Sequence, residues 1–308
     1  MANVEPIGET QVEARGQLAS GVLLATSGTF LFALKSILIK LAYVEGVGPT
    51  LILSLRMLFS LPFYVFIFAY LQRSETYVKI PRKIVAKALL LGFLGYYLAS
   101  FLDLFGLVYI SAQLERLTLF SYPAMVAVLA WMFLGEKLNR RIILSIVLCY
   151  AGVCLMYGQE SSGENSNVNL GVILVMGAAL SYSLYILFAK PTMQVIGSRR
   201  FTSLAMIGST VFVVIHAAFV LPVSDFLGAP LLVYGYCRIL AVVCTVFPSF
   251  MINEAIVRIG ATKTTVIGSI GPVLTMMLAI AILGEPSSIF HFLGMGVAIV
   301  GVSLVARK

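Results

Sequence analysis

The sequence 121-SYPAMVAVLAWMFLGE-136 recurs, changed but in the same order, as 270-IGPVLTMMLAIAILGE-285. Each copy holds a proline near its start, an apolar run and a final Gly-Glu, and the offset between the copies is 149 residues. The same offset aligns Ala112 with Ala261, so the match extends upstream without a gap. The chain therefore contains an internal repeat, and the fold must be built from two related halves.

The composition places this repeat in a membrane. Of the 308 residues, 60% are hydrophobic and 11% are charged, and the mean hydropathy is +1.01. A water-soluble core cannot bury so much apolar surface, so we predict an integral membrane protein in contact with the lipid bilayer. The net charge of +8 does not indicate a nucleic-acid partner, because the basic residues occupy short gaps between apolar runs and form no continuous solvated face.

Ten apolar segments are long enough to cross a bilayer, since a helical span needs about 20 mostly apolar residues. They cover residues 18–43, 49–71, 86–105, 112–134, 142–158, 169–189, 201–221, 231–253, 261–283 and 288–306. The segments are apolar on every face, whereas the strands of an outer-membrane barrel alternate in polarity. We therefore predict an all-α integral membrane protein with ten transmembrane helices.

Lysine and arginine gather in alternate loops of this arrangement. The second, fourth, sixth and eighth loops and both chain ends contain them, and the odd-numbered loops contain none. Basic loops stay in the cytoplasm, so we expect both termini to be cytoplasmic and the protein to be a multi-pass component of the inner (plasma) membrane.

The repeat includes the first span of each half, since residues 21–40 match residues 171–190. Five spans are an odd number, so the two halves must insert with opposite orientations. Inverted repeats are typical of carriers that alternate access around a site near the membrane midplane, although a channel or a membrane enzyme remains an alternative. The expected units are a cytoplasmic tail (1–17), a first five-helix repeat (18–158), an extracytoplasmic linker (159–168) and a second five-helix repeat (169–308).

This duplication resembles the drug/metabolite transporter superfamily, and within it the EamA-type repeat. The matching positions are Pro123, Gly135, Glu136 and Gly152, echoed by Pro272, Gly284, Glu285 and Gly301. The tyrosine before Pro123 and the tyrosine-rich third and sixth spans are similar to the YddG-type amino acid exporters. The resemblance implies export of aromatic and other neutral amino acids, with flat organic cations as a further class. It also implies a central cavity enclosed by spans 1–4 and 6–9.

Several tyrosines lie near the middle of spans, although tyrosine ordinarily prefers the membrane interface. Their rings suit aromatic amino acids and organic cations through stacking and cation–π attraction, whereas packing between helices is an equally good explanation for any one of them. The expected substrate-binding set is Tyr96, Tyr97, Phe120, Ser121, Tyr122, Tyr182, Tyr185 and Ser269.

Prolines interrupt two spans near their centres. A proline inside a helix removes one backbone hydrogen bond and bends the axis. We expect Pro123, Gly271 and Pro272 to act as gating hinges, and the alternative is a static kink that only improves packing.

Several charged residues lie within spans, where charge is costly and usually faces a cavity or a partner. The predicted topology places six of them in the outer half: Lys35, Arg56, Asp103, Glu115, Arg116 and Arg238. They form either an ion-pair network that closes an outer gate or a site for the carboxylate and ammonium of an amino acid, and snorkelling towards headgroups is the alternative. Glu115 is the one acid well placed to carry a proton, which leaves proton coupling open.

Small residues in spans 5 and 10 allow close helix packing, either within a monomer or in a weak homodimer. The sequence has no phosphate loop, metal-ligand spacing or nucleophile motif, so we expect no enzymatic activity, no metal and no cofactor. The predicted function is a secondary or facilitative carrier that exports amino acids by alternating access. The alternative is proton-coupled efflux of lipophilic or aromatic cations.

The predicted topology can be tested at 159-QESSGEN-165, which should lie outside the cytoplasm. A single cysteine placed there, in a background that lacks the four native cysteines, should react with an impermeant thiol reagent added to intact cells. Labelling only after lysis would contradict the inverted arrangement of the two halves.

Overall fold

The computed structural model describes residues 7–74, 80–161 and 167–306, and within these ranges the chain forms helices and short connections but no strand. The first half contains α1 (Ile7–Val44), α2 (Pro49–Ser74), α3 (Arg82–Gly92), η1 (Phe93–Leu98), α4 (Ala99–Tyr109), α5 (Ala112–Leu119), α6 (Tyr122–Leu134) and α7 (Arg140–Ser161). The second half contains α8 (Val168–Ile196), α9 (Ser198–Val220), α10 (Val223–Gly228), α11 (Leu231–Ala241), η2 (Val242–Val246), α12 (Phe247–Ile259), α13 (Ala261–Gly268), α14 (Ile270–Leu278), η3 (Ala279–Leu283) and α15 (Ile289–Ala306). Segments labelled η are π-helical turns.

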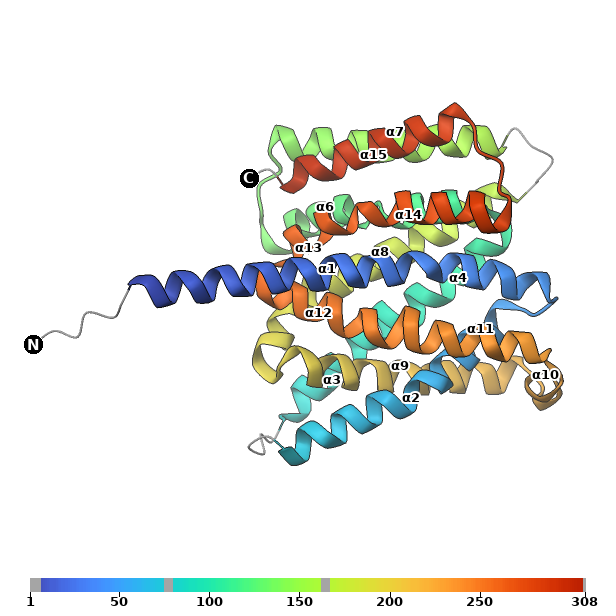
Figure 1. The fold of residues 1–308 in the computed structure, drawn as a ribbon, viewed down its shortest axis with the longest axis horizontal. Coiled ribbons are helices and arrows are strands. Elements are labelled where there is room, and N and C mark those ends of the chain that lie inside the picture. The colour runs from blue at the N-terminus through green and yellow to red at the C-terminus, as the bar shows by residue number, and fades with distance from the viewer. Residues whose placement is uncertain (1–6, 75–79, 162–166, 307–308) are drawn as a thin grey trace, which may run out of the picture.

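The described ranges contain nine helical segments that are long and apolar enough to span a membrane, and α15 adds a shorter apolar helix. The predicted all-helical, ten-span fold is confirmed. Parts of the predicted tail (1–17) and linker (159–168) lie outside the described residues. α1 already begins at Ile7, so the end of the predicted tail is helical and extends span 1 beyond the bundle (Figure 1).

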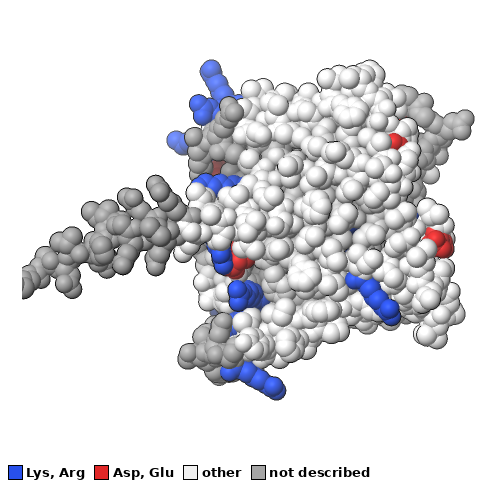
Figure 2. All heavy atoms as spheres, in the orientation of Figure 1, with Lys and Arg blue, Asp and Glu red and all other residues white. Residues whose placement is uncertain are grey.

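The helices lie side by side, and the turns between spans alternate between two ends of the bundle (Figure 1). The C-terminal ends of α2, α6, α8 and α12 lie at one end of the bundle, together with the start of α1 and the end of α15 (Figure 1). Basic side chains gather at that end in the space-filling view (Figure 2). The bundle thus has one basic end, as the charge count in the loops predicted.

α7 and α15 pack against each other along one edge of the bundle (Figure 1). Gly152 lies directly against the backbone of Gly294, so that a Cβ atom at Gly152 would collide with the Gly294 carbonyl oxygen. Two further contacts join the helices: the Ser145 hydroxyl donates to the Gly301 carbonyl, and the Cys149 thiol lies 3.7 Å from the Ala298 carbonyl. The small-residue surface is therefore used for packing within the chain.

Spans 4 and 9 are broken at equivalent points. α5 ends at Leu119 and α6 begins at Tyr122, while Ser269 separates α13 from α14. In each span a proline follows the break, and because proline has no N–H the carbonyl four residues earlier loses its helical hydrogen bond. Those carbonyls belong to Leu119 and Gly268, and both residues line the central cavity described below.

Spans 3 and 8 each contain a π-helical turn at equivalent positions of the two halves, a feature that was not apparent from the sequence. The π-helical turns η1 and η2 begin at Phe93 and Val242, which are 149 residues apart. A π turn inserts an extra residue into a helix and is frequently found at a functional site. η1 carries Tyr96 and η2 carries Thr245, and both side chains line the cavity.

The contact between α7 and α15 predicts opposite outcomes for two glycines. Gly152→Ala should lower the midpoint of thermal unfolding in detergent, because overpacking a tight contact costs about 1–3 kcal/mol. Gly296→Ala, on the same helix pair but with open space around it, should be neutral or stabilising by up to about 1 kcal/mol. Equal effects of the two substitutions would show that the seam is not closely packed.

Candidate functional site

The described part of the bundle encloses a cavity of about 140 Å³. Its walls come from spans 1–4 and 6–9, with no described residue of α7 or α15 among them. This is the arrangement that the family resemblance implied. The lining residues are Thr29, Phe32, Lys35, Arg56, Met57, Gly95, Tyr96, Ala99, Ser100, Asp103, Arg116, Leu119, Phe120, Tyr122, Tyr182, Met206, Thr245, Ser249, Ile252, Thr264 and Gly268.

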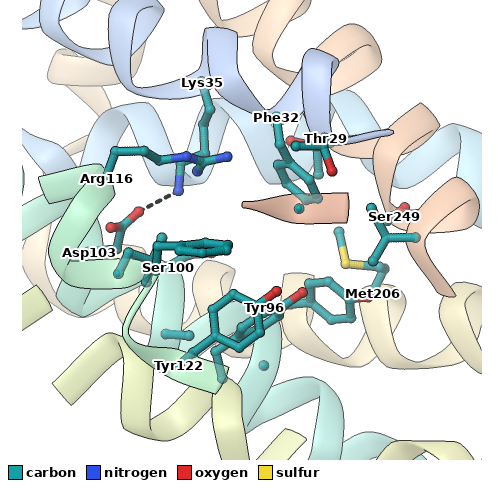
Figure 3. Close-up of a pocket in the computed structure, with 18 of the residues that line it drawn as sticks. Thr29, Phe32, Lys35, Tyr96, Ser100, Asp103, Arg116, Tyr122, Met206 and Ser249 are labelled. Carbon is teal, nitrogen blue, oxygen red and sulfur yellow. Dashed lines mark hydrogen bonds and ion pairs between the residues drawn. The ribbon is translucent and has the colours of Figure 1, made fainter. Parts of the chain in front are cut away.

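One end of the cavity is charged. Figure 3 shows Lys35, Arg116 and Asp103 together, with Ser100 beside them. The Lys35 ammonium forms an ion pair with Asp103 Oδ2, and both side chains are buried. Glu115 lies behind this pair and accepts a 2.6 Å hydrogen bond from the Ser36 hydroxyl. The structure thus brings together Lys35, Asp103, Glu115 and Arg116 of the predicted charged network, from spans 1, 3 and 4.

Arg56 lies on the cavity wall without a bonded counterion. Its side chain is buried, its Nε has no hydrogen-bond partner, and its guanidinium makes no hydrogen bond or ion pair with any described residue. Asp103 Oδ1 is likewise buried, beside the Glu115 carboxyl with which it interacts. Leaving a buried charged group unsatisfied is costly. The cavity thus presents one free cationic group.

The other part of the cavity is aromatic, with Tyr96 and Tyr122 facing the space in Figure 3. The rings of Tyr122 and Tyr182 meet edge to face, with centroids 5.2 Å apart, and Phe120 meets Tyr122 in the same way at 5.7 Å. Edge-to-face packing holds each ring in place and leaves ring surface available to a bound molecule.

A polar cluster behind the aromatic wall orients Tyr96. The hydroxyls of Tyr96 and Tyr185 lie 2.8 Å apart, and Tyr185 donates to Asn253 Oδ1 at 2.9 Å. The Asn253 amide nitrogen in turn donates to the Tyr96 hydroxyl and to Thr202 Oγ1. The cluster joins spans 3, 6, 7 and 8, so it satisfies buried hydroxyls and also holds the cavity wall together.

The structure brings together eight of the predicted site residues. The cavity is lined by Tyr96, Phe120, Tyr122, Tyr182, Lys35, Arg56, Asp103 and Arg116. Glu115 and Tyr185 are buried immediately behind the wall. Gly271 lies against Thr29 and Arg116, while Pro123 and Pro272 are buried in the broken spans.

Four other predicted site residues also do not line the cavity. Tyr97 faces another side of its helix, where its hydroxyl lies 3.1 Å from His216 Nδ1. Ser121 contacts the sulfur of Met176, and the Ser269 hydroxyl donates to the Val266 carbonyl of its own helix. Arg238 is exposed on the outside of the bundle, with its guanidinium over the Phe59 ring. Its position fits the snorkelling alternative.

Several lining residues were not predicted from the sequence. Thr29 and Phe32 precede the predicted Lys35 at helical spacing on α1, so a spacing of three residues from Lys35 could have identified them. Asn253, which supports the wall from behind, is a lone amide within an apolar span, and such an amide also indicates a polar interior. Met206 is a common apolar residue, and nothing in the sequence distinguishes it from its neighbours.

The fold and this enclosed polar and aromatic cavity define a polytopic membrane protein with a site for a small molecule. The model of the EamA-like transporter family matches residues 19–158 and 169–307, once for each half. The chain belongs to the EamA-like transporter family, a branch of the drug/metabolite transporter superfamily, and is a multi-pass membrane transporter.

Relatives support the same class. The chain is 28% identical over 292 residues to the Bacillus subtilis protein named "Uncharacterized transporter YcbK", covering 91% of this chain and 90% of the relative. A transporter from Synechocystis is 24% identical and is covered over 84% of both chains. A solved structure titled "Crystal structure of protein" superposes with a TM-score of 0.64 at 14% identity, covering 94% of this chain and 99% of the other. That last similarity concerns the fold alone.

Proposed function

We propose that this transporter exports amino acids, aromatic and other neutral, and related small metabolites from the cytoplasm by alternating access. The observation that carries the proposal is Arg56, a buried guanidinium on the cavity wall without a bonded partner. A guanidinium is well matched to a carboxylate, which it binds through two parallel hydrogen bonds. A substrate carboxylate would supply the missing partner.

The remaining groups suit the other parts of an amino acid. Arg116 lies at the same charged end and adds a second cation for the carboxylate. The Asp103 carboxylate, which lines the cavity, can accept a hydrogen bond from the substrate ammonium. The rings of Tyr96 and Tyr122 then face the substrate side chain, where stacking is available to aromatic substrates.

The size of the cavity is compatible with this substrate class. Its volume is about 140 Å³, and an apolar cavity of about 150 Å³ in another protein holds a benzene molecule. A small neutral amino acid or one aromatic ring therefore fits with little rearrangement. Larger substrates require the walls to move apart.

The charge balance of the site argues against lipophilic cations, the second candidate substrates. Three basic side chains, Lys35, Arg56 and Arg116, line the cavity with one acid, Asp103, which is already paired with Lys35. Glu115 adds a second, buried acid behind the wall. A cation without a carboxylate would meet net positive charge at this end, whereas a zwitterion would satisfy both signs.

The direction of transport, export, is the one that the resemblance to amino acid exporters implies, and the orientation of the bundle assigns its cytoplasmic end. The start of α1 and the end of α15 lie at the basic end (Figures 1 and 2), and basic loops remain cytoplasmic in membrane proteins. The inverted repeat supports alternating access, because two halves of opposite orientation can exchange conformations to open first one end and then the other.

The role of Arg56 can be tested in proteoliposomes. Arg56→Gln should weaken binding and transport of amino acids by about tenfold or more, since a hydrogen bond to a charged group contributes about 1.5–3 kcal/mol. The thermal stability of the substrate-free protein should stay the same or rise, because the substitution removes an unsatisfied buried charge. Arg238→Gln, which alters an arginine outside the cavity, is the matched control and should transport normally. Unchanged amino acid affinity in Arg56→Gln would exclude the proposed carboxylate site.

The aromatic wall predicts a second effect, on substrate preference. Tyr122→Ala should impair transport of aromatic amino acids more than transport of small aliphatic ones, by up to about tenfold for the loss of one aromatic contact. Tyr97→Ala removes a tyrosine that lies outside the cavity and should not change the ratio between the two substrate classes. An equal loss for all substrates in Tyr122→Ala would mean that this ring only packs the helices.

A further inference from the structure

The two Gly-Glu sequences that end the repeated phrase have the same backbone geometry. Gly135 and Gly284 both adopt left-handed φ angles, 67° and 64°, which glycine tolerates without strain. The following amides bond to equivalent carbonyls, Glu136 to Ala130 at 3.3 Å and Glu285 to Ala279 at 3.2 Å. Each turn therefore presents a glutamate at the end of a broken span, one at each end of the bundle.

At the end away from the termini, Glu285 holds the neighbouring span. Its carboxylate accepts hydrogen bonds from the backbone amides of Ala112 at 2.8 Å and Gln113 at 3.3 Å, the first residues of α5. A carboxylate at a helix N-terminus satisfies free amides and meets the positive end of the helix dipole. Lys40 of α1 adds electrostatic attraction to Glu285. The glutamate thus joins the outer end of span 9 to the outer end of span 4, and α14 packs on α5.

At the basic end, the equivalent glutamate, Glu136, does not bind the N-terminus of α13. The Glu136 side chain is exposed and makes no hydrogen bond or ion pair with a described residue. It lines a cavity of about 500 Å³ whose other walls include Thr265 and Val266 of α13, together with Lys190, the repeat counterpart of Lys40. α13 begins after Gly260 without a side-chain cap. The open space is therefore bordered by a free glutamate and by α13, whose N-terminus, about one turn away along the helix, has no side-chain cap.

The two ends of the bundle are built from equivalent elements, but the contact between a glutamate and a helix N-terminus is present at only one of them. The repeat offset pairs Glu285 with Glu136 and Ala112 with Ala261, the first residue of α13. If the halves exchange conformations, Glu136 reaches the start of α13 and the cavity at the basic end closes, while Glu285 leaves α5. Capping by either glutamate stabilises one of two states, and a group that binds only one state shifts the equilibrium towards it.

We propose that Glu285 and Glu136 are alternating latches: Glu285 on the N-terminus of α5 keeps the outer end closed, and Glu136 on the N-terminus of α13 closes the cytoplasmic end in the opposite state. The inference rests on the alternating access in the proposed function but not on the choice of amino acids as substrate. It assigns both glutamates a positioning role, since neither lines the central cavity.

Two cysteine reporters can measure the balance between the states in a background without native cysteines. Ala127→Cys lines the cavity at the basic end, and Leu119→Cys lines the central cavity. The first is probed from the cytoplasmic side in inside-out vesicles, and the second with an impermeant reagent from outside. Glu285→Gln should raise labelling of Leu119→Cys and lower that of Ala127→Cys, each by about fivefold, the size expected for one helix cap. Glu136→Gln should shift both in the opposite direction.

Three further variants complete the test. The double variant Glu136→Gln with Glu285→Gln should return the labelling ratio towards that of the parent, because both latches are lost. Ala112→Pro should reproduce Glu285→Gln, since it removes the amide that Glu285 binds at a helix position that accepts proline, and Ser111 already has the extended backbone that proline requires. Asp225→Asn, an exposed acid on α10, should leave both reporters unchanged.

The outcomes separate this inference from the proposed function. Equal or same-direction shifts in the two glutamate variants, or no shift in either, would overturn the latch even if amino acids are transported. If Glu285→Gln does not fold, Ala112→Pro and Glu136→Gln still have to shift the reporters in opposite directions. Opposite shifts without amino acid transport would support the latch and exclude the proposed substrates.

Discussion

The bilayer core contains no water to satisfy backbone amides and carbonyls, and the rest of the structure depends on this constraint. Each span must bond its own backbone as a helix, and irregular backbone is tolerated only against protein or a polar cavity. The breaks in spans 4 and 9 meet this condition, because Leu119 and Gly268, whose carbonyls the prolines release, line the central cavity. The irregular backbone and the cavity therefore occur together for one physical reason.

The same constraint governs the charged groups. The Lys35–Asp103 ion pair is buried among spans and neutralises both partners, which is how a membrane interior accommodates charge. Arg56 departs from this pattern, because it is buried at the cavity without a bonded partner. A ligand carboxylate would satisfy this group, and the proposed substrate site rests on that argument. The aromatic wall held by Asn253 supplies the apolar part of the same site.

Much of the site was predictable because its residue types are unusual in a span. A charge such as Arg116 or a central tyrosine such as Tyr122 is recognisable by type, and both line the cavity. The side of the helix that such a residue faces was not predictable, because apolar residues surround it on every face. Tyr97 and Arg238 are of the same unusual types, a tyrosine and a charged residue within a span, and yet they face away from the cavity. Lipid and protein interior are both apolar, so the hydrophobic pattern does not distinguish them.

The sequence by itself determined the membrane location, the number of spans, the repeat and the inverted relation of the halves. The first three follow from composition, segment length and the recurring residues, and the inversion follows because each half has five spans, an odd number. The sequence also contains the same Gly-Glu ending twice. In the structure both glycines adopt the same left-handed backbone geometry. Only the tertiary structure decided that Glu285 binds the start of α5 while Glu136 remains exposed. Ala112, whose amide Glu285 binds, lies 173 residues away along the chain, so the difference between the two glutamates depends on how the helices pack and not on any local property of the repeated phrase.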